Sequence, residues 1–456
     1  MLTNLVQFIS QELGFPFEAL VLLTAVILTY PICLFYSLTT QSKSSRFKSL
    51  YFLLSGLWLI FWAYGIDAFH SLINCCFCYF ILKTTPKRFA VAINFIFTMI
   101  YLLYGYYQTQ LDWNYSLSWT MPQCLLTLRL IAISFDLMDG QQMKSVKKDS
   151  ISSSRHIDTS IKNLPNFIDY LSYCYFPGSF FVGPLLNYVS YEKLLRTKTI
   201  DINSQNNKIR SSIIRLIGSL LITVIYFFGS KYWPVEYLFS EDFYKSSFFC
   251  RWTAIAMVSK IYMYKYILCW MIAESSCLVT GLTQDGNEIF QNVNLLAYEK
   301  ATSFNAIIQS YNITTNTFAF KYVYKRLKFL GNVYLSQILT LLFLSIWHGF
   351  ESGYHWAFSI EFLLVYFEKN SFPFLRKYRQ KYLKKSNGSD LIIWIIGRIY
   401  TFYFLGYGFL SFIFLYQKLW WPIFSSIYFI GHLLLVSYFL VTIVYKYIHS
   451  NKTQND

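Results

Sequence analysis

Apolar runs long enough to cross a lipid bilayer recur along almost the whole chain. The clearest runs are 17–38, 50–64, 66–82, 89–106, 212–228, 251–281, 338–349 with 355–367, 391–415 and 424–446, and more amphipathic runs lie at 121–137 and 168–190. A spanning helix needs about 20 mostly apolar residues. The sequence therefore predicts an all-α polytopic membrane protein with about ten or eleven transmembrane helices, some too short to cross alone, plus short re-entrant or amphipathic helices.

Composition excludes an ordinary soluble fold. Hydrophobic residues make up 55% of the chain and charged residues 14%, against about 25% charged residues in globular domains. The net charge is +16, which in a soluble protein would suggest nucleic acid. Here the positive residues lie mostly between the apolar runs, a pattern typical of cytosolic loops and of attraction to anionic lipid. We expect membrane lipids as partners and no nucleic acid.

The polar stretches suggest one multi-pass membrane domain over residues 1–456. Polar loops are expected at 138–165 and 369–390, the second of them basic and therefore cytosolic, and a disordered tail at 448–456. Cys75, Cys76 and Cys78 form a tight cluster, but no histidine or carboxylate follows at the spacing of a zinc site. No metal site is expected.

The stretch "LFLSIWHGFESGYHWAF", residues 342–358, places His348 inside an apolar run. Ionisable groups in a span are costly and usually face a cavity or a partner, and histidine moves protons near neutral pH. Asn312 lies 36 residues upstream (348 − 312) in "SYNITTN" and could donate a hydrogen bond to developing negative charge. A proton acceptor with a neutral donor suits acyl transfer from a thioester. The alternatives are a structural histidine and an asparagine that caps a helix or forms a turn.

Two further patterns are unusual for membrane helices. "YFPGSFFVGP" contains Gly178 and Gly183 with two prolines, which favours a broken or re-entrant segment beside a cavity over a regular helix, the alternative being a kinked helix. Lys321, Lys325 and Lys328 follow at i, i+4 and i+7, with Arg326 beside them, and predict a basic stripe on an amphipathic helix at the membrane interface.

Five motifs in order resemble the membrane-bound O-acyltransferase family. They are "SLSWTMPQCLLTLRLIAISFDLMDG", "YFPGSFFVGP", "YKYILCWMIAES", "SYNITTNTFAFKYVYKRLKFLGN" and "LFLSIWHGFESGY", and they run from about residue 115 to 367. The closest likeness is to the lysophospholipid acyltransferase branch, especially lysophosphatidylcholine acyltransferases. The third motif departs from the family pattern, with Met263 where an arginine is common and Ser275 where a glycine is common.

The resemblance implies a ring of helices around a central tunnel, with a catalytic pair midway that falls on His348 and Asn312. Candidates for the tunnel wall are Trp347, Gly178, Gly183, Trp270 and Glu274. Trp270 and Glu274 are four residues apart and share a helix face, which suits packing equally well. The basic residues Lys321, Lys325, Arg326 and Lys328 would hold the phosphates of coenzyme A, or equally the headgroups of anionic lipids.

The function that follows from the resemblance is an acyl-CoA-dependent lysophospholipid O-acyltransferase of the endoplasmic reticulum membrane, active in phospholipid remodelling. Acyl-CoA would be a co-substrate, with no permanently bound cofactor, and the lysophospholipid, most of all lysophosphatidylcholine, would accept the acyl chain at its sn-2 hydroxyl. A homodimer is left open. The alternatives are a family member that acylates a protein or neutral-lipid hydroxyl, and a transporter or scramblase without enzymatic activity.

Overall fold

A computed structural model describes residues 2–13, 16–111, 118–145, 159–197, 202–284, 288–382 and 387–452. The chain divides into two compact units, which are described separately. Unit 1 comprises Met1–Leu221, Ile267–Asn292 and Thr314–Tyr322. Unit 2 comprises Ile222–Tyr266, Val293–Ile313 and Val323–Asp456. Two long helices, α10 (Ile202–Tyr232) and α12 (Phe248–Thr280), contribute residues to both units.

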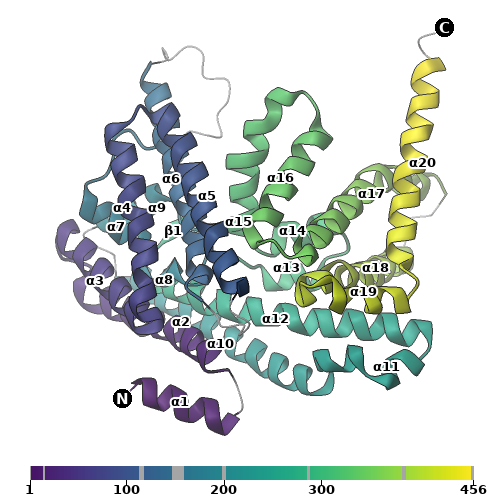
Figure 1. Ribbon diagram of the computed structural model, residues 1–456, viewed down its shortest axis with the longest axis horizontal. Helices are drawn as coiled ribbons and strands as arrows, with labels where there is room; N and C mark the ends of the chain where they lie inside the picture. The colour runs from purple at the N-terminus through teal and green to yellow at the C-terminus, as the bar shows by residue number, and fades with distance from the viewer. Residues whose placement is uncertain are drawn as a thin grey trace. The chain divides into compact units, whose positions relative to one another are not determined.

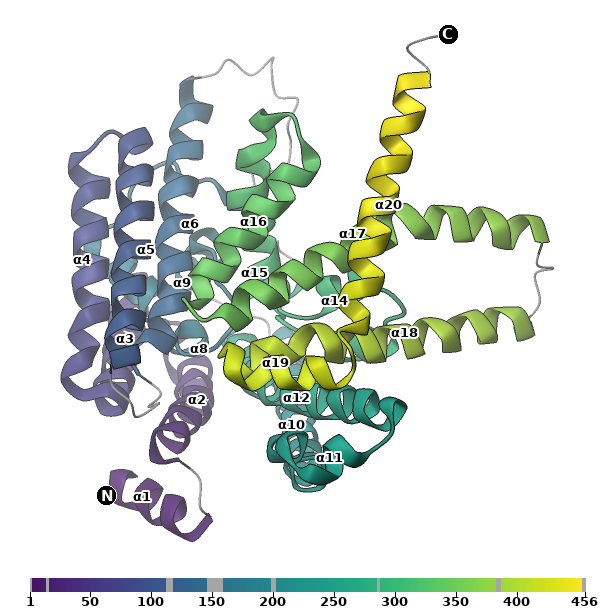
Figure 2. The same cartoon turned by 45° about the vertical axis from the view of Figure 1, so that its right-hand side comes forward.

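Unit 1 contains a group of long helices in which α4, α5 and α6 lie side by side (Figures 1 and 2). Its first helices are α1 (Leu2–Leu13), α2 (Phe17–Phe35) with the π-helix η1 (Tyr36–Thr40), α3 (Ser45–Tyr64), the 3-10 turn η2 (Gly65–Asp67), α4 (Ala68–Thr84), α5 (Lys87–Leu111) and α6 (Thr120–Ser145). Shorter elements follow: α7 (Phe167–Cys174), α8 (Pro177–Phe180), α9 (Tyr188–Arg196), the two-residue strands β1 (Thr283–Gln284) and β2 (Glu288–Ile289), and most of α15 (Ile313–Phe318) and the π-helix η6 (Ala319–Val323).

Unit 2 is built around α16, α17 and α18, with α17 packing against both neighbours (Figure 2). Its elements are η5 (Val235–Phe239), α11 (Glu241–Lys245), α13 (Leu295–Lys300), α14 (Phe304–Ser310), the 3-10 helix η7 (Tyr324–Leu330), α16 (Val333–His348), α17 (Ser352–Tyr382), α18 (Asn387–Phe414), α19 (Gln417–Ser426) and α20 (Ile430–Lys452). Tyr407, Trp420 and Phe424 lie in its buried aromatic core. Asn332 begins α16 by accepting hydrogen bonds from the backbone N–H groups of Tyr334 and Leu335.

The helices confirm the prediction of an all-α polytopic membrane protein. Among the described residues, seven helical segments are long and apolar enough to span a membrane, or up to eight when α19 and α20, which meet at 84°, count as one span. This is below the ten or eleven spans expected from the apolar runs. Ser45–Thr84 counts once although it holds both α3 and α4, and α16, with 16 residues, is shorter than the about 20 that a span requires.

The run at 168–190 is not a span but three short helices, so the predicted break is confirmed. Helix α7 ends at Cys174, α8 covers one turn from Pro177, and no helix follows until α9. Arg129 on α6, which is buried, stabilises this break. Its guanidinium donates hydrogen bonds of 2.8–2.9 Å to the carbonyl oxygens of Tyr173, Cys174 and Ser179. Carbonyl groups released by the break are thereby satisfied without lipid contact.

The polar segments are more helical than expected. Helix α6 continues through 138–145 and α17 through 369–382, so both predicted loops are shorter than the sequence suggested, because a helix does not end where its apolar residues end. Helix α20 continues to Lys452, so 448–452 is helical and not a disordered tail. Residues 146–158, 383–386 and 453–456, which complete these predictions, lie outside the described residues.

Candidate active site

His348 is the last residue of α16, at a sharp change of chain direction. Gly349 follows with φ 141°, a backbone conformation that residues with a side chain rarely adopt. A Cβ on Gly349 would lie 2.6 Å from a carboxylate oxygen of Glu351. The glycine therefore ends α16 at His348 and lets α17 begin at Ser352, which confirms the predicted interruption of the apolar run.

Four aromatic rings surround the imidazole of His348. The ring of Tyr354 stacks on it at a centroid distance of 5.2 Å, Phe358 lies at 5.6 Å, and Phe412 of α18 presents its edge at 5.0 Å. The indole of Trp347, which is buried, lies at 4.4 Å. These rings hold the imidazole in place without occupying its nitrogen atoms.

The imidazole of His348 is partly buried, and neither of its nitrogens has a hydrogen-bond partner within the part of the chain that the structure describes. A structural histidine in an apolar region is normally satisfied by a carbonyl or hydroxyl group. The histidine at position 70 fits that description, since its Nδ1 lies 2.8 Å from the hydroxyl of Tyr101 and its ring stacks on Trp119. The nitrogens of His348, by contrast, are left for a group outside the described chain.

A second histidine of the same stretch has a hydrogen-bond partner. Nδ1 of His355 lies 2.9 Å from the hydroxyl oxygen of Ser345, which also lies 2.9 Å from the carbonyl oxygen of Leu342. This contact joins the first turn of α17 to the turn of α16 that precedes His348.

Asn312 lies in unit 2, in the turn between α14 and α15, with φ 52°. Asparagine is one of the few residues with a side chain that adopts this left-handed conformation readily. The backbone just before it is well anchored, because Tyr311 forms a bridge with Val293 and the N–H of Asn294 donates to the carbonyl of Ser310 at 2.8 Å. The turn assignment and a catalytic role for the side chain are compatible.

Glu274, a predicted tunnel residue, is fully buried in unit 1 and part of a polar network. One carboxylate oxygen lies 3.0 Å from Nε of Arg215, and the other accepts from the backbone N–H of Asn292 at 2.6 Å. The side-chain oxygen of Asn292 in turn accepts from the N–H and hydroxyl of Thr314. This network favours the packing role for Glu274. Trp270, one turn earlier on α12, is partly buried.

Gly178 and Gly183, also predicted to line the tunnel, are close-approach positions in unit 1. A Cβ on Gly178 would lie 3.2 Å from Sγ of Cys277 on α12, and a Cβ on Gly183 would lie 2.6 Å from the Cα of Ser179. The thiol of Cys277 donates to the carbonyl of Gly178 at 3.2 Å. Both glycines are thus required by packing around the broken segment.

The basic residues do not form a stripe on a regular α-helix, which corrects the sequence prediction. Helix α15 ends at Phe318, η6 is π-helical and η7 is 3-10 helical, so the i, i+4, i+7 spacing does not place Lys321, Lys325 and Lys328 on one α-helical face. The exposure of the basic residues also differs: Lys328 is exposed, whereas Lys325 and Arg326 are partly buried.

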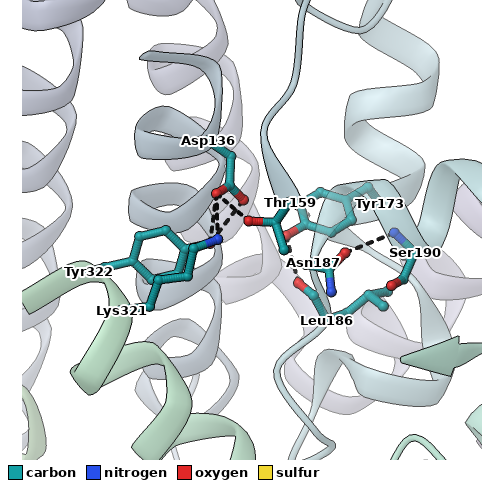
Figure 3. A network of polar contacts seen from close by, with 8 residues as sticks. All are labelled: Asp136, Thr159, Tyr173, Leu186, Asn187, Ser190, Lys321 and Tyr322. Atoms are coloured by element: carbon teal, nitrogen blue, oxygen red, sulfur yellow. Dashed lines mark hydrogen bonds and ion pairs between the residues drawn. The ribbon is translucent and has the colours of Figure 1, made fainter. Parts of the chain in front are cut away.

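Lys321 takes part in a buried network with Asp136 of α6, 185 residues away in sequence (Figure 3). Its Nζ lies 3.0 Å from Oδ1 of Asp136, and the side chains are only 12% and 2% exposed. The hydroxyls of Tyr322 and Thr159 donate to the same carboxylate at 2.8 Å. Burial, and the charge of Asp136, raise the pKa of the Tyr322 hydroxyl well above its usual range, so it remains a donor.

No group of three or more His, Cys, Asp or Glu side chains that could hold a metal ion occurs within the described ranges. What unit 2 offers at His348 is a partly buried imidazole in contact with four aromatic rings. His348 and Trp347 beside it were predictable from the sequence. Glu361, a carboxyl group in the predicted span 355–367, was not predicted, although its position in an apolar run was an available signal.

Gly353→Ala tests how closely α17 must approach α18 beside His348. The added Cβ would lie 2.1 Å from the carbonyl oxygen of Ser411 and 2.7 Å from the Cα of Leu415. The helices must separate, so we expect a loss of about 1–3 kcal/mol of stability and displacement of Phe412 from the imidazole. Thermal unfolding in detergent measures the first effect. Gly388→Ala on α18, where a Cβ meets nothing within 4 Å, is the control and should be neutral.

Residues 106–410 match the sequence model of the membrane-bound O-acyltransferase family. The chain is 33% identical to lysophospholipid acyltransferase 5 of Homo sapiens over 97% of its own length and 91% of that protein. It is 32% identical to the protein of the same name from Rattus norvegicus, over 96% of this chain and 91% of the relative. The Drosophila melanogaster protein of that name is 30% identical, over 94% of this chain and 87% of its own length.

Proposed function

This chain belongs to the membrane-bound O-acyltransferase family, and we propose that it transfers a fatty acyl chain from acyl-CoA to the sn-2 hydroxyl of a lysophospholipid, first of all lysophosphatidylcholine. The observation that carries the proposal is the imidazole of His348, held by aromatic rings at the end of α16 with its nitrogens unoccupied within the described chain. The names of the relatives support a lysophospholipid as acceptor.

In the proposed reaction His348 is the general base. Its free nitrogen takes the proton of the sn-2 hydroxyl while the oxygen attacks the thioester carbon. The amide of Asn312 donates a hydrogen bond to the oxyanion that forms. When the tetrahedral intermediate collapses, the carbon–sulfur bond breaks and the thiolate of coenzyme A receives the proton from His348. The products are a diacylphospholipid and free coenzyme A, and no covalent enzyme intermediate is required.

The aromatic surroundings suit this chemistry because the acyl chain must be buried while it reacts. In unit 2, Trp347 is proposed as a wall residue of an acyl tunnel. In unit 1, Glu274, Gly178 and Gly183 fix the helices on which they lie, and Trp270 stays a candidate for substrate contact. We place the enzyme in the endoplasmic reticulum membrane, with acyl-CoA entering from the cytosol and the lysophospholipid from the bilayer. A homodimer is not required by this mechanism.

Lys325, Arg326 and Lys328 are proposed to bind the phosphates of coenzyme A. Lys321 is assigned a supporting role instead, because its ammonium group is paired with Asp136. Charge-assisted hydrogen bonds to phosphate contribute about 1.5–3 kcal/mol each. We therefore expect Lys325→Ala with Lys328→Ala to raise the KM for acyl-CoA at least about 10-fold with kcat little changed.

The control for this pair is Lys245→Ala, which removes an exposed lysine whose ion pair with Glu241 lies on the surface. This variant should leave the KM for acyl-CoA and kcat unchanged. If the basic residues bind anionic lipid instead, the double variant will keep its KM for acyl-CoA and will respond to the anionic lipid content of the membrane.

The proposed function is tested in membranes from a host that lacks its own lysolipid acyltransferases. Labelled acyl-CoA is supplied with lysophospholipids that differ in headgroup, and product is measured for the wild-type chain. Headgroup-dependent product supports the proposal. If correctly inserted protein acylates no lysophospholipid, the acceptor is a protein or a neutral lipid, and lipid transfer between leaflets without acyl-CoA would identify a scramblase.

A further inference from the structure

Glu361 is a carboxyl group without a partner in an apolar part of unit 2. It lies on α17, is partly buried, and has neither a hydrogen bond nor an ion pair within the ranges that the structure describes. Glu368, seven residues further along the same helix, is satisfied: its two oxygens accept from the backbone N–H groups of Phe304 and Asn305. Hydrogen bonds to the backbone therefore explain why Glu368 has a carboxyl group, whereas no contact within the described chain explains that of Glu361.

Glu361 lies on the same face of α17 as the residues that contact His348. The α17 residues that contact the imidazole are Tyr354 and Phe358. Glu361 follows them by seven and three residues and therefore lies on the same face of the helix. With a rise of 1.5 Å per residue, its Cα lies about 4.5 Å beyond that of Phe358 along the axis. Side chains of a helix lean toward its N-terminus, so this carboxyl leans back toward the turn that contacts His348.

A lone carboxyl group in such surroundings is costly and is usually retained for a ligand. The complementary ligand is a cation. A lysophospholipid whose sn-2 hydroxyl lies at His348 carries its headgroup on the other side of a phosphodiester. The headgroup would therefore lie a short distance from His348 along α17. A carboxylate at that place attracts a terminal ammonium group and repels the phosphate of a lysophospholipid that carries no cation to compensate it. The face of an aromatic ring such as that of Phe358 also favours a quaternary ammonium ion.

We propose that Glu361 is a specificity-determining residue that binds the cationic headgroup of a choline or ethanolamine lysophospholipid. This inference rests on the proposed function and deepens it, because it names the residue that selects the headgroup. The carboxylate contacts the ammonium group of the substrate and takes no part in proton transfer. His348 alone exchanges the proton with the hydroxyl and the leaving thiolate.

The test compares Glu361→Gln with the matched variant Glu368→Gln. We expect Glu361→Gln to lower kcat/KM for lysophosphatidylcholine at least about 10-fold, mainly through KM. The value for lysophosphatidylglycerol, which has no cation, should be unchanged or higher, and the KM for acyl-CoA unchanged. Glu368→Gln should lower thermal stability and leave the choline-to-glycerol ratio of kcat/KM as in the wild type.

An equal loss of activity with both headgroups would overturn the inference, because it would place Glu361 in catalysis or folding. An unchanged ratio of the two kcat/KM values would overturn it as well. If the wild-type chain acylates no lysophospholipid, the proposed function fails, and binding decides the inference separately. Thermal stabilisation by lysophosphatidylcholine over lysophosphatidylglycerol, present in the wild type and lost in Glu361→Gln, would support it, whereas equal stabilisation of the wild type by both would overturn it.

Discussion

His348→Ala is expected to lower kcat/KM for lysophospholipid acylation by about 10²–10⁴-fold, the usual contribution of a positioned general base. The loss should appear in kcat, because the imidazole assists proton transfer in the transition state and contributes little to substrate binding. The fold should survive, since the described structure shows no hydrogen bond to this ring and only aromatic packing is lost. Initial rates with varied acyl-CoA and lysophospholipid, on protein quantified in the membrane, measure the effect.

Two further variants separate proton transfer from packing. His348→Gln retains a polar side chain of similar size that cannot accept a proton at neutral pH, so its activity should be as low as that of His348→Ala. His70→Gln alters a histidine that bonds to Tyr101 and stacks on Trp119, so it should affect stability more than kcat. Substantial activity in a well-folded His348→Gln protein would exclude the general-base mechanism.

His348 could be singled out from the sequence because the signal is local. A histidine followed by glycine in an apolar run predicts both an interruption and a functional group, and the structure confirms the interruption, since α16 ends at this residue. The break at 174–188 was predictable for the same reason, since Gly178 and its proline neighbours disfavour a helix over a short window. The helix ends at 145 and 382 could not be predicted, because a helix continues into polar sequence as long as its backbone groups remain hydrogen-bonded.

Long-range pairing could not be predicted from the sequence. Lys321 pairs with Asp136 across 185 residues, and Glu274 is joined to Thr314 through Asn292. The regular spacing of the lysines suggested an α-helix, but a π-helix and a 3-10 helix replace it. A π-helix shifts the positions of the residues that follow it, so sequence spacing alone misassigned the face.

The buried pair of Asp136 and Lys321 gives the largest expected effect on stability. Asp136→Asn leaves the ammonium of Lys321 buried without its counter-charge, and Lys321→Met leaves the carboxylate without its own. Removing one partner of a buried ion pair costs about 3–5 kcal/mol. We expect each single variant to unfold at a clearly lower temperature in detergent than the wild type, with the hydroxyl donors Tyr322 and Thr159 limiting the loss for Lys321→Met.

The double variant Asp136→Asn with Lys321→Met distinguishes a structural pair from a phosphate-binding lysine. It removes both charges, and a neutral pair is often no less stable than the buried ions it replaces, so the double variant should be more stable than either single one. If the pair is structural, the KM of the folded protein for acyl-CoA should stay at the wild-type value in all three variants. A Lys321→Met protein with wild-type stability and a raised KM for acyl-CoA would show instead that the ammonium group binds phosphate.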